Sequence, residues 1–392
     1  MTLTTMDHVP ILRRGSMADF VADVRCRRQE IEDGRRLPAP VLQGLVDAGL
    51  ARLCVPRRFG GDETDPIGFM AVVEEVARAD ASTAWCLWIY SSAPWFLSRA
   101  ADGVADELFA DGPDLLIASP LVPKGVATPT AGGYRLSGRW PFASGSQGAD
   151  WLVCRAVVAG ARAGEAGGGP PAMRLMLVPA ASVTTVDTWW TSGLCGTGSG
   201  DVVVDDVFVP EPHAIDFDGA GSRWPESLYS FPHRGLACVS AAIALGVARD
   251  SLDEFIGLAQ AKTPTFGSSR LAERSQVQTK VARAEAELGS ARAYLHQSVG
   301  EAWESVLSTG SVPARLQAML RAAANHACRA AAGVVDTVYN AAGGTSIYRS
   351  SPLQRSFRDI HSVTQHFFHS EDVDEQAGRV LLGVDDLGAT RL

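Results

Sequence analysis

Two kinds of hydrophobic pattern divide the chain into three consecutive parts. Both ends carry apolar residues every three or four positions, the period of an amphipathic helix, whereas residues from about 115 to 217 form short runs rich in Val, Thr, Gly and Pro. The C-terminal helical segments are long and rich in Ala, and such helices bury themselves by packing on one another. The sequence therefore predicts an α+β protein with an N-terminal helical domain (1–114), a central antiparallel β-barrel-like domain (115–217) and a C-terminal four-helix bundle (218–392).

Within these parts, local signals predict individual elements. Asp65 precedes Pro66 and is expected to cap one helix, and Ser82 is expected to cap the next. The second of these helices carries four residues at spacings of three, four and three, which puts them on one face: Trp85, Trp88, Ser92 and Trp95. The Gly- and Ala-rich stretch 159–172 cannot pack a core and is expected to connect two strands.

Composition excludes several classes of protein. The formal net charge is -9, with 44 acidic and 35 basic residues and no run of Lys or Arg, which argues against a nucleic-acid-binding surface. No apolar stretch approaches the roughly 20 residues that span a bilayer, and the first 14 residues lack the core of a signal peptide. The seven cysteines are scattered without a CxxC spacing, which argues against disulfides and structural zinc and favours a cytoplasmic protein.

Few short motifs with a known chemistry are present. GTGSG (196–200) precedes a strand-like segment instead of a helix, which favours a turn over a nucleotide-binding loop. His366 and His369 share a helix face, but His361 lies about 140° away from His366, so no metal site is predicted. The break at Gly343–Gly344 exposes backbone N–H groups that can face a phosphate or a flavin edge, although the spacing alone favours a Gly cap between two helices.

Four motifs, in this order, resemble the acyl-CoA dehydrogenase superfamily, and the resemblance covers residues from about 15 to 385. The motifs are LVDAGLARLCVPRRFGGDETDP (45–66), GRWPFASGSQGADWLV (138–153), GLCGTGSGDVVVDDVFVP (193–210) and AGGTSIYRSSPLQRSFRDIHSVTQH (342–366). The resemblance implies the acyl-CoA dehydrogenase fold. It also implies a homotetramer formed through the C-terminal bundles.

One position separates the branches of this family. Dehydrogenases often carry their base in a segment like RDxxxxxxYEGT, and aligning RDIHSVTQHFFH with it puts His366 at the tyrosine and Phe367 at the glutamate. Phenylalanine cannot accept a proton. A histidine at this position is instead similar to the flavin-dependent monooxygenases, the oxygenase components of two-component hydroxylases.

That branch implies a particular chemistry. A separate reductase supplies reduced flavin (FMNH2 or FADH2), which reacts with O2 to a C4a-hydroperoxide that hydroxylates an aromatic or polycyclic small molecule. Two alternatives remain open at this stage. One is an acyl-CoA dehydrogenase or an oxygen-independent flavoenzyme, a dehydratase or desaturase, on the same fold. The other is a non-catalytic scaffold.

The resemblance also implies roles for individual residues. His366 is expected beside the flavin, where an imidazole with a pKa near neutrality relays a proton, and Ser144 is expected to contact flavin N5. The other residues expected to contact the cofactor are Ser119, Trp140, Phe142, Gly343, Gly344, Thr345 and, from a neighbouring subunit, Arg270. The expected substrate pocket consists of Trp85, Trp88, Ser92, Trp95 and His369.

Overall fold

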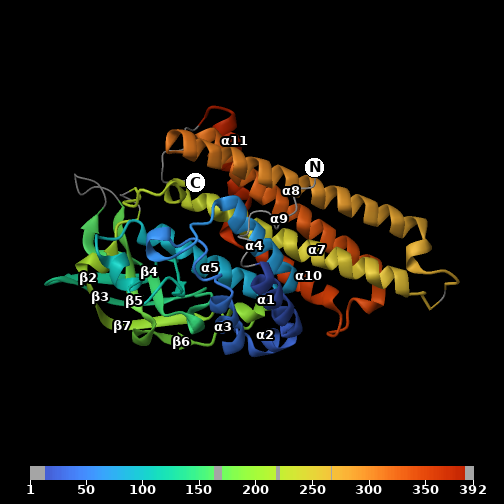
Figure 1. The fold of residues 1–392 in the computed structure, drawn as a ribbon, viewed down its shortest axis with the longest axis horizontal. Coiled ribbons are helices and arrows are strands. Elements are labelled where there is room, and N and C mark those ends of the chain that lie inside the picture. The colour runs from blue at the N-terminus through green and yellow to red at the C-terminus, as the bar shows by residue number, and fades with distance from the viewer. Residues whose placement is uncertain (1–13, 163–169, 218–220, 266, 385–392) are drawn as a thin grey trace.

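The N-terminal and C-terminal parts of the chain form helices, and the part between them forms a single sheet (Figure 1). The computed structural model describes residues 14–162, 170–217, 221–265 and 267–384. The N-terminal helices are α1 (Arg14–Cys26), α2 (Arg28–Gly34), α3 (Ala39–Asp47), α4 (Pro66–Ala79), α5 (Ala81–Leu97) and α6 (Val104–Leu108). The prediction about the first 14 residues concerns residues 1–13, which lie outside the described part of the chain, and Arg14.

The caps of α4 and α5 are both aspartates. Asp65 caps α4 as predicted, because its carboxylate accepts a hydrogen bond of 2.8 Å from the amide of Gly68. The prediction of Ser82 as the cap of α5 is wrong. The cap is Asp80. Its carboxylate accepts a hydrogen bond of 2.7 Å from the amide of Thr83 and one of 2.8 Å from the Thr83 hydroxyl, so the helix begins at Ala81.

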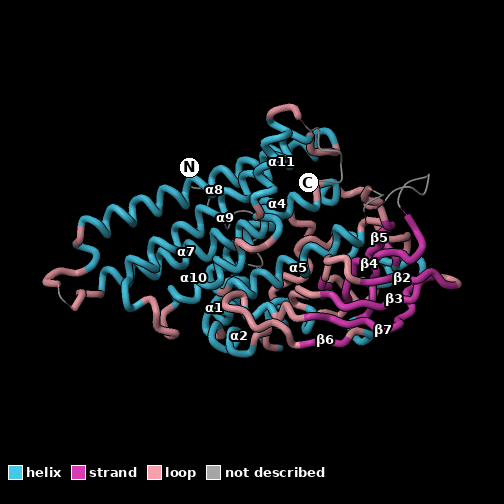
Figure 2. The backbone as a smooth tube through the Cα atoms, turned by 180° about the vertical axis from the view of Figure 1, so that it is seen from behind, coloured by secondary structure: helices cyan, strands magenta, loops and turns pink. Residues whose placement is uncertain are grey.

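The eight strands in the described part of the chain form one mixed sheet at one end of the molecule (Figure 2). They are β1 (Ile117–Ala118), β2 (Gly125–Thr130), β3 (Gly133–Trp140), β4 (Trp151–Arg162), β5 (Pro171–Pro179), β6 (Thr184–Val186), β7 (Asp201–Pro210) and β8 (Ala214–Ile215). Their order is β6-β7-β3-β2-β4-β5-β8, with β1 beside β4. The sheet is not wholly antiparallel as predicted, because β4 runs parallel to both β1 and β2. The alternating pattern of each strand carries no information about the direction of its neighbour.

The predicted connector at 159–172 is shorter than expected. β4 continues to Arg162 and β5 begins at Pro171, and the two strands pair antiparallel along most of their length. Residues 163–169 lie outside the described part of the chain.

The C-terminal part is a bundle of long helices, as predicted. They are α7 (Ala237–Ala261), α8 (Ser275–Thr309), α9 (Ala314–Ala342), α10 (Pro352–Val363) and α11 (Glu371–Leu381). Helix α7 lies in the middle and packs on α4, α9 and α10. The segment His233–Ala261 has the length and apolar composition of a membrane span, contrary to the prediction, but 94% of its most apolar window is buried by the surrounding helices. It therefore serves as the core helix of the bundle.

Candidate active site

The three parts of the chain meet around the indole ring of Trp85 in α5. From the sheet, the hydroxyl of Ser144 accepts a hydrogen bond of 3.2 Å from Trp85 Nε1. From the C-terminal part, the imidazole of His366 lies with its centroid 5.2 Å from the Trp85 ring, at 78°. Trp88, one turn along α5, lies edge-on at 5.0 Å from Trp85 and at 5.5 Å from His366. The structure thus brings together four of the residues that the sequence indicated.

The turn after β3 holds Ser144 in this position. Phe142 has a positive φ of 60° and a side chain that is 64% exposed, so the turn projects an aromatic ring outward. The carbonyl of Gly145 accepts a hydrogen bond of 2.7 Å from the Tyr90 hydroxyl. A Cβ at Gly145, where φ is +72°, would lie 2.7 Å from that same hydroxyl oxygen, which explains the glycine.

A chain of buried hydroxyls fixes the direction of the Ser144 proton. The Thr197 hydroxyl donates to the carbonyl of Leu194 at 2.8 Å, so Ser199, at 2.6 Å, must donate to Thr197. Ser144, at 2.6 Å from Ser199, must then donate to Ser199. Because its only proton is used in this way, the Ser144 oxygen faces Trp85 and the site as a hydrogen-bond acceptor.

His366 is neutral at pH 7 and has a defined tautomer. Burial among the surrounding rings lowers its pKa to about 4, although the residue as a whole keeps some contact with solvent. The amide of Phe368 donates to His366 Nδ1 at 3.4 Å, so the single imidazole proton lies on Nε2. The expectation of a pKa near neutrality is therefore wrong, because it did not include the desolvation of the imidazole. In this structure His366 offers a neutral N–H donor.

His369 is fully buried three residues further on. The Ser240 hydroxyl donates to the Ala237 carbonyl at 2.9 Å, so His369 Nε2, 2.9 Å from Ser240 Oγ, is the donor of that pair. Burial, with the nearby His366 and Arg321, lowers the pKa of His369 to about 3. Its Nδ1 has no hydrogen-bond partner in the described part of the chain.

These pKa values predict how stability depends on pH. His366, His233 and His369 titrate near 6.5 when unfolded but at about 4, 3 and 3 when folded, so at pH 5 the unfolded chain binds three more protons at these residues. Asp359 opposes one of them, because burial and then Asp80 raise its pKa from 3.8 to about 7. Since the net difference is two protons, the free energy of unfolding should fall on acidification from pH 6.5 to 4, by at most roughly 1.4 kcal/mol per pH unit for each net proton.

Urea unfolding at several pH values between 4 and 6.5 measures this slope. Asp359→Asn removes the opposing group and should steepen it. A stability that is flat or rises on acidification would contradict the assignment of neutral buried histidines.

Three of the residues predicted to contact flavin or substrate lie in the core instead. Trp140 is 0% exposed and donates a hydrogen bond of 2.7 Å to the Arg155 carbonyl inside the sheet. Trp95 is also fully buried and donates 3.0 Å to the Phe231 carbonyl. The hydroxyl of Ser92 donates a hydrogen bond of 2.7 Å to the Trp88 carbonyl of its own helix. Trp85 and Trp88 are nearly as buried, at 6% and 4% exposed, and differ in that their rings contact His366. A shared helix face did not reveal this difference.

The remaining predicted residues are distributed over other parts of the molecule. Ser119 follows β1 and is half-buried. Gly343 and Gly344 are exposed at the end of α9, and Thr345 beside them accepts a hydrogen bond of 2.5 Å from Lys262 at the end of α7. Arg270 is exposed in the turn that joins α7 to α8. This turn lies at the end of the bundle opposite the sheet (Figures 1 and 2). One chain therefore does not bring Gly343, Gly344, Thr345 and Arg270 to Ser144 and His366.

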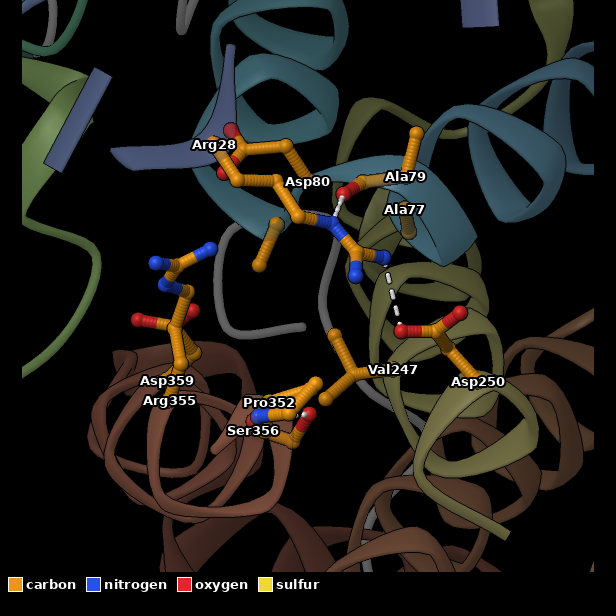
Figure 3. A pocket seen from close by; sticks show the side chains of 11 residues that line it. Arg28, Ala77, Ala79, Asp80, Val247, Asp250, Pro352, Arg355, Ser356 and Asp359 are labelled. Carbon is orange, nitrogen blue, oxygen red and sulfur yellow. Dashed lines mark hydrogen bonds and ion pairs between the residues drawn. The ribbon is translucent and has the colours of Figure 1, made fainter. Parts of the chain in front are cut away.

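A cluster of charged residues on α10 and its neighbours is linked to the segment before Ser199, and sequence reasoning missed it. Asp359 accepts a hydrogen bond of 2.7 Å from the amide of Leu194, which ties α10 to the segment that carries Thr197 and Ser199. Figure 3 shows Asp359 and Asp80 around a small pocket with Arg28 and Arg355, with an internal volume of about 20 Å³, room for one water. The adjacent Arg and Asp of the RD motif were a signal for this cluster, but their buried neighbours come from other helices.

The fold and the site define a flavoprotein of the acyl-CoA dehydrogenase class. Two family models match, "Acyl-CoA dehydrogenase, N-terminal domain" over residues 12–101 and "Acyl-CoA dehydrogenase, C-terminal domain" over 238–371. The chain is 34% identical over 373 residues to the indole-3-acetate monooxygenase of Pseudomonas putida, covering 95% of this chain and 94% of that protein. It therefore belongs to the acyl-CoA dehydrogenase superfamily, in the branch of flavin-dependent monooxygenases, as the sequence motifs predicted.

Other relatives agree with this membership. The chain is 29% identical to the oxygenase component of the FADH(2)-dependent resorcinol hydroxylase of Rhizobium sp., covering 98% of this chain and 97% of that one. Among solved structures, the 3-HSA hydroxylase from Rhodococcus sp. RHA1 has a TM-score of 0.87 at 25% identity, over 96% and 98% of the two chains. XiaF from Streptomyces sp., in complex with FADH2, has a TM-score of 0.88 at 26% identity, over 96% and 97%. The predicted fold is thus confirmed.

Proposed function

We propose that this protein is the oxygenase component of a two-component aromatic hydroxylase. It would take FMNH2 or FADH2 from a separate reductase and use O2, activated at the flavin C4a position, to hydroxylate an aromatic small molecule. One oxygen atom enters the substrate, the other leaves as water, and reduced flavin is oxidised. The single observation that carries the proposal is the meeting of Ser144 and His366 at Trp85 in a chain whose relatives are named as monooxygenases of aromatic compounds.

The residues at this meeting point fit a flavin. Phe142 and Phe367 are exposed aromatic rings, 64% and 61%, on the two segments that carry Ser144 and His366, and apolar faces of this kind suit an isoalloxazine ring. Trp88 Nε1 is a buried donor without a partner among the described residues, as expected where a bound molecule supplies an acceptor. Ser144 and Phe142 would hold the flavin ring. The cofactor would supply the electrons and the activation of O2.

The chain's own residues would then orient and protect the reacting groups. Ser144 Oγ, a committed acceptor, suits the N5–H group that reduced flavin has and oxidised flavin lacks. His366 Nε2–H is a neutral donor that would hold an oxygen atom beside the ring by a hydrogen bond. Trp85, Trp88 and Phe368 surround His366 and exclude water, which would otherwise favour release of H2O2.

The exposed residues at the other end of the bundle suggest how a full site is completed. We propose that Gly343, Gly344, Thr345 and Arg270 approach the flavin phosphate of a neighbouring subunit in a homotetramer. Lys262 supports this grouping, because its hydrogen bonds to the Ala342 carbonyl, 2.9 Å, and to Thr345 hold the ends of α7 and α9 together.

Rapid mixing tests the function. Protein with reduced FMN or FADH2 is mixed with oxygenated buffer, with and without an aromatic substrate such as indole-3-acetate, and flavin absorbance and hydroxylated product are followed. The proposal expects an oxygenated flavin that persists far longer than free reduced flavin in air, and product that depends on O2. Reduction of bound oxidised flavin by acyl-CoA thioesters would instead favour a dehydrogenase, and absence of flavin binding in either redox state a non-catalytic scaffold.

A further inference from the structure

A buried guanidinium with no counter-charge among the described residues lies inside the C-terminal bundle. Arg321, in α9, is only 5% exposed. Its Nε and Nη1 are buried and have no hydrogen-bond partner in the described part of the chain, where Arg321 also forms no ion pair. Arg329, two turns further along the same helix, differs, because it is exposed and pairs with Asp374.

Such a residue is costly for the folded protein. A buried charge that is neither paired nor hydrogen-bonded strongly destabilises the fold, because it loses its hydration and gains nothing in return. Burial, and then the nearby positive charge of Arg234, lowers the pKa of Arg321 to about 10, so the side chain stays charged at neutral pH. A cation kept at this cost, with no carboxylate beside it among the described residues, is complementary to an anionic ligand.

The position of Arg321 connects it to the aromatic site. Asn325, one turn along α9, donates 3.4 Å to the carbonyl of Ser370, so this part of α9 lies against the segment Phe367–His369. Arg321 is close enough to His369 to affect its pKa. The same segment reaches the site, because Phe368 lies 6.0 Å from the ring of Trp88. Arg321 and Trp88 Nε1 are therefore both donors without acceptors among the described residues, and each has a neighbour in this segment, His369 and Phe368 respectively.

We propose that Arg321 forms an anion subsite that binds the carboxylate of an aromatic acid while the ring of that acid lies near Trp88 and His366. The assignment rests on the proposed function for the position of the ring, and it goes further by naming the class of substrate, an arylacetate or a similar aromatic carboxylate. A guanidinium suits this task because its fork of N–H groups matches the two oxygens of a carboxylate.

A pair of ligands that differ in charge but hardly in shape tests the subsite. The dissociation constants of indole-3-acetate and of its neutral amide, indole-3-acetamide, are measured by calorimetry under anaerobic conditions with the full-length protein and reduced flavin. Arg321→Met should weaken indole-3-acetate by roughly 10- to 150-fold, the scale of a lost hydrogen bond to a charged group, and leave the amide nearly unchanged. The matched control Arg329→Met removes a charge from the same helix and should change neither.

Thermal unfolding without substrate separates binding from a structural role. Because Arg321→Met replaces an unpaired buried charge with an apolar side chain of similar length, it should raise the unfolding temperature. A lower unfolding temperature, or an equal loss of affinity for acid and amide, would overturn the subsite. Arg321→Lys keeps the charge and should therefore retain a preference for the acid over the amide. Loss of that preference in Arg321→Lys would also contradict the subsite.

The two proposals can fail separately. If the wild type hydroxylates neutral indole and indole-3-acetate equally well and Arg321→Met preserves both activities, the oxygenase stands and the subsite fails. If Arg321→Met abolishes the preference for the acid in calorimetry but no flavin–oxygen reaction occurs in any variant, the subsite stands and the oxygenase fails.

Discussion

His366→Ala is expected to lower the rate of product formation by roughly 100- to 1,000-fold, the cost of removing one positioned donor from a reacting centre. The fold should persist, because His366 is a partly exposed residue at the surface of the Trp85–Trp88 cluster. Reduced flavin should still be oxidised by O2, but the electrons should appear as H2O2 instead of product. Product, H2O2 and flavin oxidation are measured together under one supply of reduced flavin.

Two neighbouring histidines provide the controls. His361→Ala should leave coupling unchanged, because His361 Nε2 contacts Asp336 at 2.9 Å on the outside of α10. His369→Ala should affect coupling less than His366→Ala, since His369 is bonded to Ser240 behind the ring cluster. Unchanged coupling in His366→Ala, or a severe loss in His361→Ala, would contradict the assignment. Unfolding of His366→Ala would show that the residue is needed for structure.

Trp95→Ala should destabilise the protein by roughly 3–5 kcal/mol, the range for truncation of a large buried aromatic side chain. The ring fills the core beside Tyr229, with centroids 5.7 Å apart, and its removal also leaves the Phe231 carbonyl without its donor. Urea unfolding measures the loss.

Trp88→Phe is the matched comparison on the same helix. Its Nε1 has no partner to lose, so its stability should change far less than that of Trp95→Ala, while its affinity for an aromatic substrate should change. If Trp95→Phe changed substrate affinity but not stability, the placement of Trp95 in the core would be wrong.

The tryptophans of α5 illustrate how much of the site the sequence could predict. Spacing puts Trp85, Trp88 and Trp95 on one side of α5, and the helix exists as predicted. Nearly the whole helix is buried, however, so a shared side does not mean a shared environment: Trp85 meets Ser144 from the sheet, whereas Trp95 meets Phe231 from the segment before α7. Contacts between residues so far apart in sequence leave no signal in helical period.

The same limit applies to the pKa of a buried side chain and to the choice of a helix cap. The motif containing His366 indicated its position, but its pKa of about 4 results from burial among rings that include Trp85 and Trp88 of α5, which the motif does not contain. Likewise, the cap Asp80 and the residue predicted in its place, Ser82, are both good caps, and only the folded helix selects one. Local patterns predicted the helices, the strands and their order along the chain. Contacts between residues far apart in sequence determine the environment and the protonation state of the site residues.

The junction at Trp85 also has a consequence for the newly made chain. The hydrogen bond from Trp85 to Ser144 joins residues that precede His366 in the chain by more than 200 positions, so His366 is synthesised after both of them. Because N-terminal units generally fold first during synthesis, Ser144 can be in position before His366 arrives. A nascent chain that has not yet reached His366 would therefore hold only half of the proposed site, and the residue proposed to couple flavin oxidation to product would be the last of the pair to arrive.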